Sequence, residues 1–185
     1  AFGKPLYKIA DISEMTLRVY ISEKQLAAVK VGQKVTVKID GADEIDMVIN
    51  IGFLKDKKYE LVENEIKEIK NKIALSADRQ GNKILKVIIE TCYLTNEEKQ
   101  IATQLIINAG ADFVKTSTGF GTGGATLEDV AILKPIAQNK IQIKASGGIK
   151  DYETAIKYIE LGVHRIGTSN GIQIVTGQKS TEQSY

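Results

Sequence analysis

Two lysine residues stand at the ends of apolar segments that are one β-α unit apart in the chain. Lys115 follows Phe113 and Val114 in "ADFVKTSTGF", and Lys144 follows Ile143 in "IQIKASGG". If the segments are neighbouring parallel strands, the two amines meet at one edge of the sheet. Burial and a nearby ammonium both lower a lysine pKa, and a neutral amine attacks carbonyl carbons to form a Schiff base. We therefore expect Lys115 to be a nucleophile and Lys144 its electrostatic neighbour. The alternative, common for a strand-end lysine, is that each side chain simply extends to solvent.

An acidic residue stands at a similar level of an earlier apolar segment, "EIDMVIN" (44–50). Its Asp46 could orient the lysines or relay protons. A Schiff base withdraws electrons from the adjacent carbon, so these three residues could make or break a carbon–carbon bond. This chemistry needs no metal, and we expect no cofactor.

Two glycine-rich turns follow the last two predicted strands. "SGGI" (146–149) contains Gly147 and Gly148, and "GTSNG" (167–171) contains Gly167, Thr168 and Ser169. Consecutive loops of this kind commonly bind phosphate in β/α barrels through backbone N–H groups. One glycine loop alone is more often only a turn, but two beside the lysines favour a phosphorylated substrate.

Strand-like and helix-like segments alternate from about residue 43 onward. The expected strands are 44–50, 84–90, 112–116, 141–148 and 164–171. The expected helices are 55–73, 94–110, 126–138, 151–162 and a short one near 171–176. Strands joined through helices are typical of a parallel α/β sheet. A doubly wound sheet is the alternative, but its G-x-G-x-x-G turn is not seen. The fold class expected is therefore α/β, a partial TIM-type (β/α) barrel with five of eight units, preceded by a small β-rich segment.

Residues 1–42 have a different pattern, with short strand-like stretches at 5–10, 15–22 and 34–40. Only residues 11–14 join the first two stretches. Because a parallel crossover needs a dozen or more residues, this link favours an antiparallel pair. We expect one domain over residues 1–42 and a second over residues 43–185.

The motifs of the second part resemble deoxyribose-phosphate aldolase over about residues 41–176. "EIDMVIN", "LKVIIET", "ADFVKTSTGF", "IKASGGI" and "RIGTSNG" occur in the order and spacing of that family. The resemblance implies a metal-free class I aldolase on a (β/α)8 barrel. Such an enzyme reversibly cleaves 2-deoxyribose 5-phosphate to glyceraldehyde 3-phosphate and acetaldehyde. It also implies that Lys115 is the Schiff-base lysine, Lys144 the second active-site lysine and Asp46 the active-site aspartate. The C-terminal Tyr185 matches a tyrosine that aids proton transfer in some members.

The family pattern has three further β-α units before "GADEIDMV", which this sequence lacks. The first 40 residues instead resemble part of a periplasmic adaptor, the HlyD-like membrane fusion protein, so we expect a chimera with its seam at "DGAD" (40–43). An incomplete barrel has open edges that invite pairing, and we expect a homo-oligomer that covers them. Its activity should be weak or lost.

The composition is that of an ordinary soluble domain, with 185 residues, 43% hydrophobic and 26% charged. A net charge of +2 gives no reason to expect a nucleic acid or membrane partner. The single cysteine, Cys92, and the lack of an apparent export signal favour the cytoplasm. We expect Cys92 and the lone His164 to be structural, and Lys86 and Glu90 could form an ion pair inside the barrel.

Three functions stay open from the sequence. The first is cleavage of a deoxysugar phosphate. The second is a barrel-like fold that binds phosphate without turnover. The third is an interaction module that acts through the adaptor-like segment.

Overall fold

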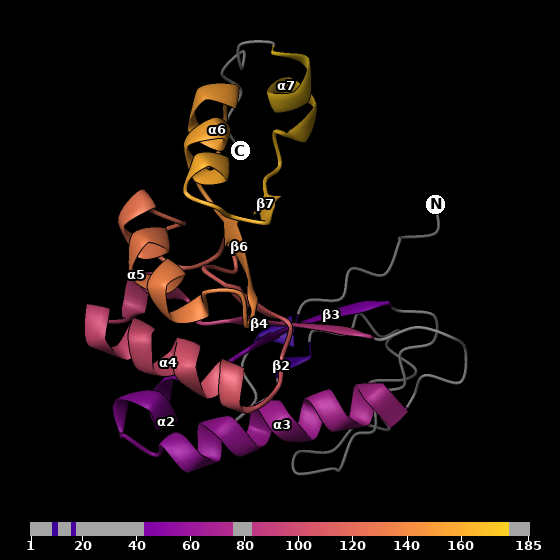
Figure 1. The fold of residues 1–185 in the computed structure, drawn as a ribbon, viewed down its shortest axis with the longest axis vertical. Helices are drawn as coiled ribbons and strands as arrows, with labels where there is room; N and C mark the ends of the chain where they lie inside the picture. Colours follow the sequence, from indigo (N-terminus) through magenta and orange to yellow (C-terminus); the bar gives the residue numbers. More distant parts are fainter. Residues whose placement is uncertain (1–8, 11–15, 18–42, 76–82, 178–185) are drawn as a thin grey trace, which may run out of the picture.

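Five parallel strands form the centre of the molecule (Figure 1). The computed structural model describes residues 9–10, 16–17, 43–75 and 83–177. The strands are β3 (Glu44–Val48), β4 (Ile84–Ile88), β5 (Phe113–Lys115), β6 (Gln142–Ser146) and β7 (Arg165–Gly167). They lie side by side in chain order, and each pair of neighbours is parallel. Strand order that never reverses is the arrangement of a barrel and not of a doubly wound sheet.

Helices connect the strands and pack on one another along the outside of the sheet. They are α2 (Ile51–Lys55), α3 (Tyr59–Leu75), α4 (Asn96–Asn108), α5 (Leu127–Ala137), α6 (Tyr152–Glu160) and α7 (Gly171–Thr176), with a 3-10 turn η1 at Thr91–Tyr93. Contacts join α3 to α4, α4 to α5 and α5 to α6. This unbroken series places the helices on one side of the strands, as in the outer layer of a partial barrel.

The helix expected over residues 55–73 is α3, and a short helix that was not expected, α2, precedes it. The Asn50 side chain accepts a hydrogen bond from the N–H of Phe53 at 2.9 Å and so starts α2 directly after β3. Lys57 has a φ of 58°, which no helix allows, and α3 begins only at Tyr59. The other helices lie close to their expected ranges, and a capping box of Thr95 and Glu98 starts α4.

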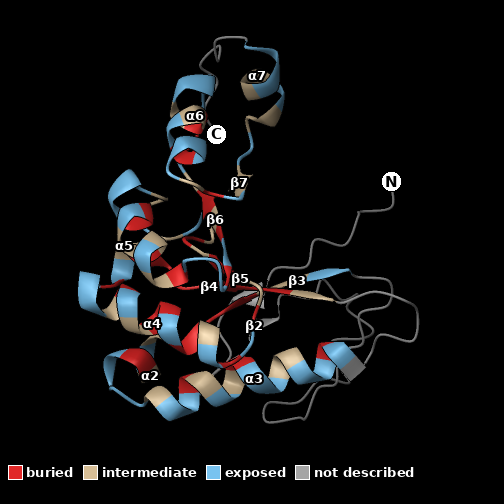
Figure 2. Cartoon of the chain, in the orientation of Figure 1, coloured by how far each residue is buried: buried red, intermediate tan, exposed pale blue. Residues whose placement is uncertain are grey.

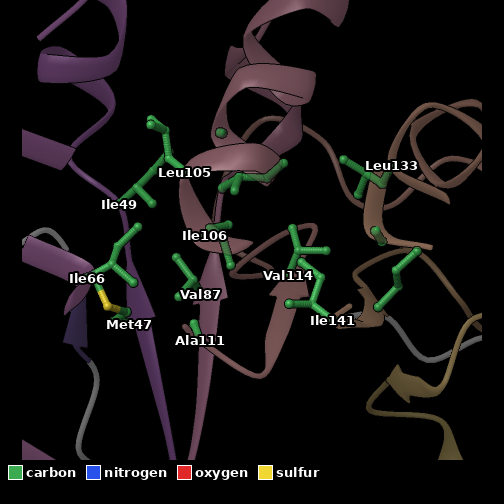
Figure 3. Packing of buried hydrophobic residues seen from close by; sticks show 14 of the residues in the cluster. Met47, Ile49, Ile66, Val87, Leu105, Ile106, Ala111, Val114, Leu133 and Ile141 are labelled. Atoms are coloured by element: carbon green, nitrogen blue, oxygen red, sulfur yellow. The ribbon is translucent and has the colours of Figure 1, made fainter. Parts of the chain in front are cut away.

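Alternation along the strands separates an apolar face from a polar one. The apolar face packs on the helices (Figure 3). Its members include Met47, Val87, Val114 and Ile143 on the strands and Ile66, Ile106 and Leu133 on α3, α4 and α5. Buried residues follow the strands and the inner sides of the helices (Figure 2). The opposite face, which is the barrel interior, therefore carries the polar side chains described below.

The first 42 residues are described only at two short strands. β1 (Ile9–Ala10) and β2 (Thr16–Leu17) pair antiparallel, with Ile9 opposite Leu17. The short link between them had favoured this direction. The strand expected at 34–40 and the end of the chain, with Tyr185, lie outside the described residues, and the domain boundary at residue 42 stays a prediction. Within the described ranges, no helix combines the length and apolar character needed to cross a membrane.

Candidate active site

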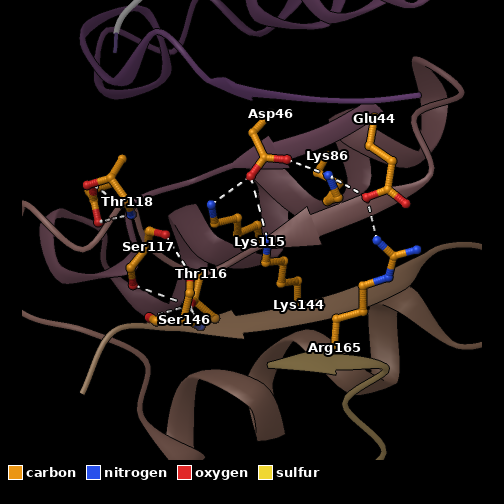
Figure 4. A network of polar contacts seen from close by, with 11 residues as sticks. Glu44, Asp46, Lys86, Lys115, Thr116, Ser117, Thr118, Lys144, Ser146 and Arg165 are labelled. Carbon is orange, nitrogen blue, oxygen red and sulfur yellow. Dashed lines mark hydrogen bonds and ion pairs between the residues drawn. The ribbon is translucent and has the colours of Figure 1, made fainter. Parts of the chain in front are cut away.

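The register of β5 and β6 brings the two predicted lysines together, because Lys115 and Lys144 are direct cross-strand partners. Both point to the barrel interior and meet one carboxylate oxygen of Asp46 (Figure 4). Lys115 Nζ lies 2.7 Å from Asp46 Oδ2, and Lys144 Nζ lies 3.7 Å from the same oxygen. Only 12% of the Lys115 side chain and 19% of the Lys144 side chain are exposed. Neither lysine therefore extends freely into solvent, and the alternative reading of them fails.

The second oxygen of Asp46 accepts a hydrogen bond from a third lysine. Lys86 Nζ lies 2.6 Å from Asp46 Oδ1 and 3.0 Å from Glu44 Oε2. Glu44 in turn forms a short ion pair with Arg165 on β7. A chain of alternating charges thus crosses the barrel interior from β7 to β3 and on to the paired lysines (Figure 4).

Most of this series of charged residues was not predicted from the sequence. Glu44 and Arg165 were not singled out, and the ion pair suggested between Lys86 and Glu90 is wrong. Lys86 is in register with Asp46 on the adjacent strand, so it pairs sideways with β3 and not along its own strand. Strand alternation was the available signal, because it places Glu44, two residues before Asp46, on the same face.

Four cationic side chains surround two carboxylates in this cluster, and the pKa of each carboxylate is lowered. Burial is the largest single influence on Asp46 and raises its pKa. Hydrogen bonds from Lys115 and Lys86 and the charges of Lys115 and Lys144 together outweigh burial and lower the pKa from 3.8 to about 2. Hydrogen bonds from Arg165 and then Lys86 lower the pKa of Glu44 from 4.5 to about 2. Both acids are therefore ionised near neutral pH.

The excess of positive charge also acts on the lysine pair. Burial, and then the charge of Lys115, lower the pKa of the Lys144 amine, while Asp46 opposes this. The direction is the one expected for two amines in a partly dry site. A proton can therefore leave Lys144 more readily than it leaves an ordinary surface lysine.

Buried hydroxyl groups fix the ends of the two lysine-bearing strands. Thr116 and Ser117 are fully buried, and Ser146 is 6% exposed. Thr116 Oγ1 accepts from the N–H of Ser146 at 3.1 Å, and Ser146 Oγ donates to the carbonyl of Ser117 at 2.6 Å. Because these bonds join β5 and β6 just beyond the lysines, they fix the relative positions of the strand ends that carry the two amines.

A pocket of about 430 Å³ opens beside the lysines at this edge of the sheet. Lys115 and Lys144 line it, as do all five residues predicted to bind phosphate, namely Gly147, Gly148, Gly167, Thr168 and Ser169. Within the pocket wall, Thr168 Oγ1 donates to the carbonyl of Ile149 at 2.6 Å and so ties the two glycine loops together. The pocket is thus lined both by the two amines and by glycine backbone.

Close backbone packing explains why residue 124, in the loop after β5, is a glycine. A β-carbon on Gly124 would lie 2.4 Å from the carbonyl oxygen of Gly147, so no side chain fits there. Gly147 itself has a φ of 87°, which side-chain-bearing residues rarely adopt. The loops after β5 and β6 therefore touch through their backbones and shape the pocket together.

His164 and Cys92, for which structural roles were expected, do not line this pocket. His164 Nδ1 accepts a hydrogen bond from the N–H of Ile143 at 3.1 Å, at the opposite end of the strands. Cys92 is a free, half-buried thiol. In the described part of the chain, no three His, Cys, Asp or Glu side chains are grouped so as to hold a metal ion.

Comparison with known sequences gives a consistent match. The model of the DeoC/LacD family of aldolases matches residues 8–175. The deoxyribose-phosphate aldolase of Thermococcus kodakarensis is 59% identical over 138 residues, which are 75% of this chain and 59% of that protein. The enzyme of the same name from Carboxydothermus hydrogenoformans is 47% identical over 181 residues, 98% of this chain and 78% of that protein. The chain thus spans less than two thirds of the first of these relatives.

Solved structures agree with the fold. An aldolase called QR15 superposes with a TM-score of 0.68 at 48% identity, covering 75% of this chain and 59% of its own. The deoxyribose phosphate aldolase of Aeropyrum pernix, described as a tetramer, gives 0.65 at 32% identity, with 76% of this chain and 56% of its own covered. These likenesses support the interpretation of the sheet as part of a barrel.

The comparisons give no support for the adaptor-like interpretation of the first 42 residues. The family match already begins at residue 8, and the alignment with the Carboxydothermus enzyme includes nearly the whole chain. The resemblance to an HlyD-like segment covered only about the first 40 residues. The expected chimera therefore finds no support either.

Proposed function

Because the chain belongs to the DeoC/LacD family of aldolases, we propose that it is a class I aldolase. It reversibly cleaves 2-deoxyribose 5-phosphate to glyceraldehyde 3-phosphate and acetaldehyde. The observation that supports this most is the shared contact of Lys115 and Lys144 with one oxygen of Asp46, beside a glycine-lined pocket.

Schiff-base formation is the first task of the site. The neutral amine of Lys115 attacks the aldehyde carbon of the open-chain sugar, and water leaves as the C=N bond forms. The nitrogen of Lys115 loses a proton to Lys144, whose pKa is lowered by burial and by the charge of Lys115. Asp46 stays ionised and holds the attacking amine within 2.7 Å.

Cleavage follows from the electron demand of the protonated Schiff base. A base removes the proton from the hydroxyl on the third carbon, that carbon becomes the new aldehyde, and the bond between the second and third carbons breaks. Its electron pair forms an enamine on Lys115. Protonation of the enamine and hydrolysis then release acetaldehyde. Lys144 and Asp46 are the groups within reach that can exchange these protons, and Tyr185 remains a candidate donor at the end of the chain.

The phosphate of the substrate takes the far side of the pocket. Gly147, Gly148, Gly167, Thr168 and Ser169 line it, and glycine lets the backbone approach the phosphate oxygens closely. The excess positive charge of the lysine cluster also favours an anionic substrate.

We further propose that the protein is a homo-oligomer that acts in the cytoplasm. Among the described residues, β7 has a strand partner on one side only, and an unpaired edge favours association. The Aeropyrum relative is described as a tetramer. Size-exclusion chromatography with light scattering measures this directly, and a monomer at all concentrations would contradict it.

Borohydride trapping tests the nucleophile. Reduction in the presence of acetaldehyde should leave an ethyl group on Lys115, located by peptide mass spectrometry. Lys115→Met should abolish this label, whereas Lys140→Met, at an exposed lysine of the opposite end, should not. An ethyl group on Lys144 instead would reverse the two roles, and an unlabelled protein would end the proposal.

Turnover is the second part of the test. Release of glyceraldehyde 3-phosphate from 2-deoxyribose 5-phosphate can be followed by a coupled dehydrogenase assay. Phosphate binding without any release would favour a non-catalytic barrel.

A further inference from the structure

Glu90 is a buried acid that the proposed reaction does not use. It follows β4 at the same edge of the sheet as the lysines, and only 4% of it is exposed. Its backbone is left-handed, with φ 53° and ψ 68°. Both features cost free energy, and residues held in such strain cluster at functional sites. Contacts made by the carboxylate must therefore compensate.

Within the described part of the chain, the hydrogen bonds to this carboxylate come from one residue of the loop after β5. The N–H of Thr118 lies 3.2 Å from each carboxylate oxygen, and the Thr118 hydroxyl donates a short bond to Oε2. The same hydroxyl accepts from the N–H of Phe120 at 3.0 Å. One carboxylate thus fixes the backbone of residues 118–120, here called the 118–120 segment.

The following residue packs directly on the acid. A β-carbon at Gly121 would lie 3.2 Å from the carboxyl carbon of Glu90 and 2.9 Å from Cys92 Sγ. The loop therefore contacts Glu90 through both hydrogen bonds and close packing.

The 118–120 segment is one wall of the pocket that holds the lysines. Thr118, Gly119 and Phe120 line this pocket together with Lys115 and Lys144, whereas Glu90 lies behind the wall and is not a lining residue. Figure 4 shows Thr118 at the end of the row of site residues, beyond Lys115. Glu90 can therefore act on a bound substrate only through the segment.

We propose that Glu90 is a positioning residue, which sets the 118–120 segment so that the wall holds the five-carbon substrate against Lys115. This inference rests on the proposed aldolase function. A small aldehyde such as acetaldehyde reaches the amine without needing the wall. The two substrates therefore separate the role of Glu90 from that of the lysines.

The test compares Glu90→Gln with the wild-type protein. The substitution keeps the shape but removes the charge that makes the Thr118 bonds strong. We expect kcat/KM for 2-deoxyribose 5-phosphate to fall about tenfold, the size expected for loss of one charge-assisted hydrogen bond. Borohydride trapping of acetaldehyde on Lys115 should stay within about twofold, which a general loss of structure would not allow.

A second variant keeps the test valid if Glu90→Gln folds poorly. Thr118→Val removes the hydroxyl at constant volume and should give a similar loss. The double variant should lose little more than either single one, because both substitutions break the same link. Thr103→Val is the matched control: its fully buried hydroxyl donates to the carbonyl of Lys99 within α4, so kcat/KM should not change.

Hydrogen exchange gives a reading that does not depend on turnover. The amides of Thr118 and Phe120 should exchange faster in Glu90→Gln, since both are held by this network. Unchanged kcat/KM and exchange, or fully additive losses in the double variant, would overturn the role of Glu90. Wild-type protein that neither traps acetaldehyde nor cleaves the sugar would remove the proposed function as well, so the two failures are distinguishable.

Discussion

The ionised form of Asp46 should contribute directly to the stability of the folded chain, and Asp46→Asn should show it. The carboxylate is held between Lys86, Lys115 and Lys144, and its side chain is 30% exposed. Its pKa falls from 3.8 to about 2 on folding. At about 1.4 kcal/mol for each tenfold change in the protonation equilibrium, the folded state gains about 2 kcal/mol at neutral pH. The asparagine variant should therefore unfold about 2 kcal/mol more easily at pH 7.

The pH dependence follows from the direction of the shift. A carboxyl group whose pKa is lowered in the folded state stabilises it fully above the unfolded pKa, and this contribution is lost as pH falls through the folded pKa. For Asp46 the loss begins below about pH 4 and is about half complete at pH 3. The difference in the free energy of unfolding between wild type and Asp46→Asn should narrow by the same amount.

Urea denaturation followed by circular dichroism at pH 7, 4 and 3 measures this gap. Asp56→Asn is the matched control, because Asp56 is 61% exposed and pairs with the exposed Lys58. Such a surface pair contributes between zero and about 1 kcal/mol. If the free energies of unfolding of wild type and Asp46→Asn differ by the same amount from pH 7 to pH 3, the reasoning is refuted. A variant as stable as wild type at pH 7 would refute it as well.

Two further predictions concern the loops and the far end of the strands. Gly124→Ala should lower the free energy of unfolding by about 1–3 kcal/mol and weaken substrate binding, because the new β-carbon meets the carbonyl of Gly147. Gly171→Ala, which meets open space, should change stability little, and equal melting temperatures for the two variants would contradict this account. Burial, and then the charge of Lys134, lower the pKa of His164, whose neutral Nδ1 accepts from Ile143. Its stabilising contribution is thus present above pH 6.5 and lost as pH falls through the lower folded pKa, so His164→Gln should flatten the stability curve between pH 5 and pH 7.

Local chemistry made several parts of this protein predictable from its sequence. The capping box of Thr95 and Glu98 starts α4, and because it needs only residues three apart it can be recognised in the sequence. Gly110 ends the same helix with a φ of 74°, the conformation that glycine favours. The break between α2 and α3 escaped prediction, because it turns on Lys57 in a left-handed conformation that lysine rarely adopts.

The sequence by itself also determined the parallel strands, the neighbouring lysines and the pocket-lining glycines. Strand length, β-α alternation and the repeated position of Lys115 and Lys144 are properties of short segments, and a parallel register converts them into adjacency. Tertiary structure alone decided which acids face which cations. Glu44 meets Arg165 across 121 residues, and Glu90 binds Thr118 instead of Lys86. These pairings depend on the curvature of the sheet and the path of one loop, which arise from packing of the whole chain and leave no periodic trace in it.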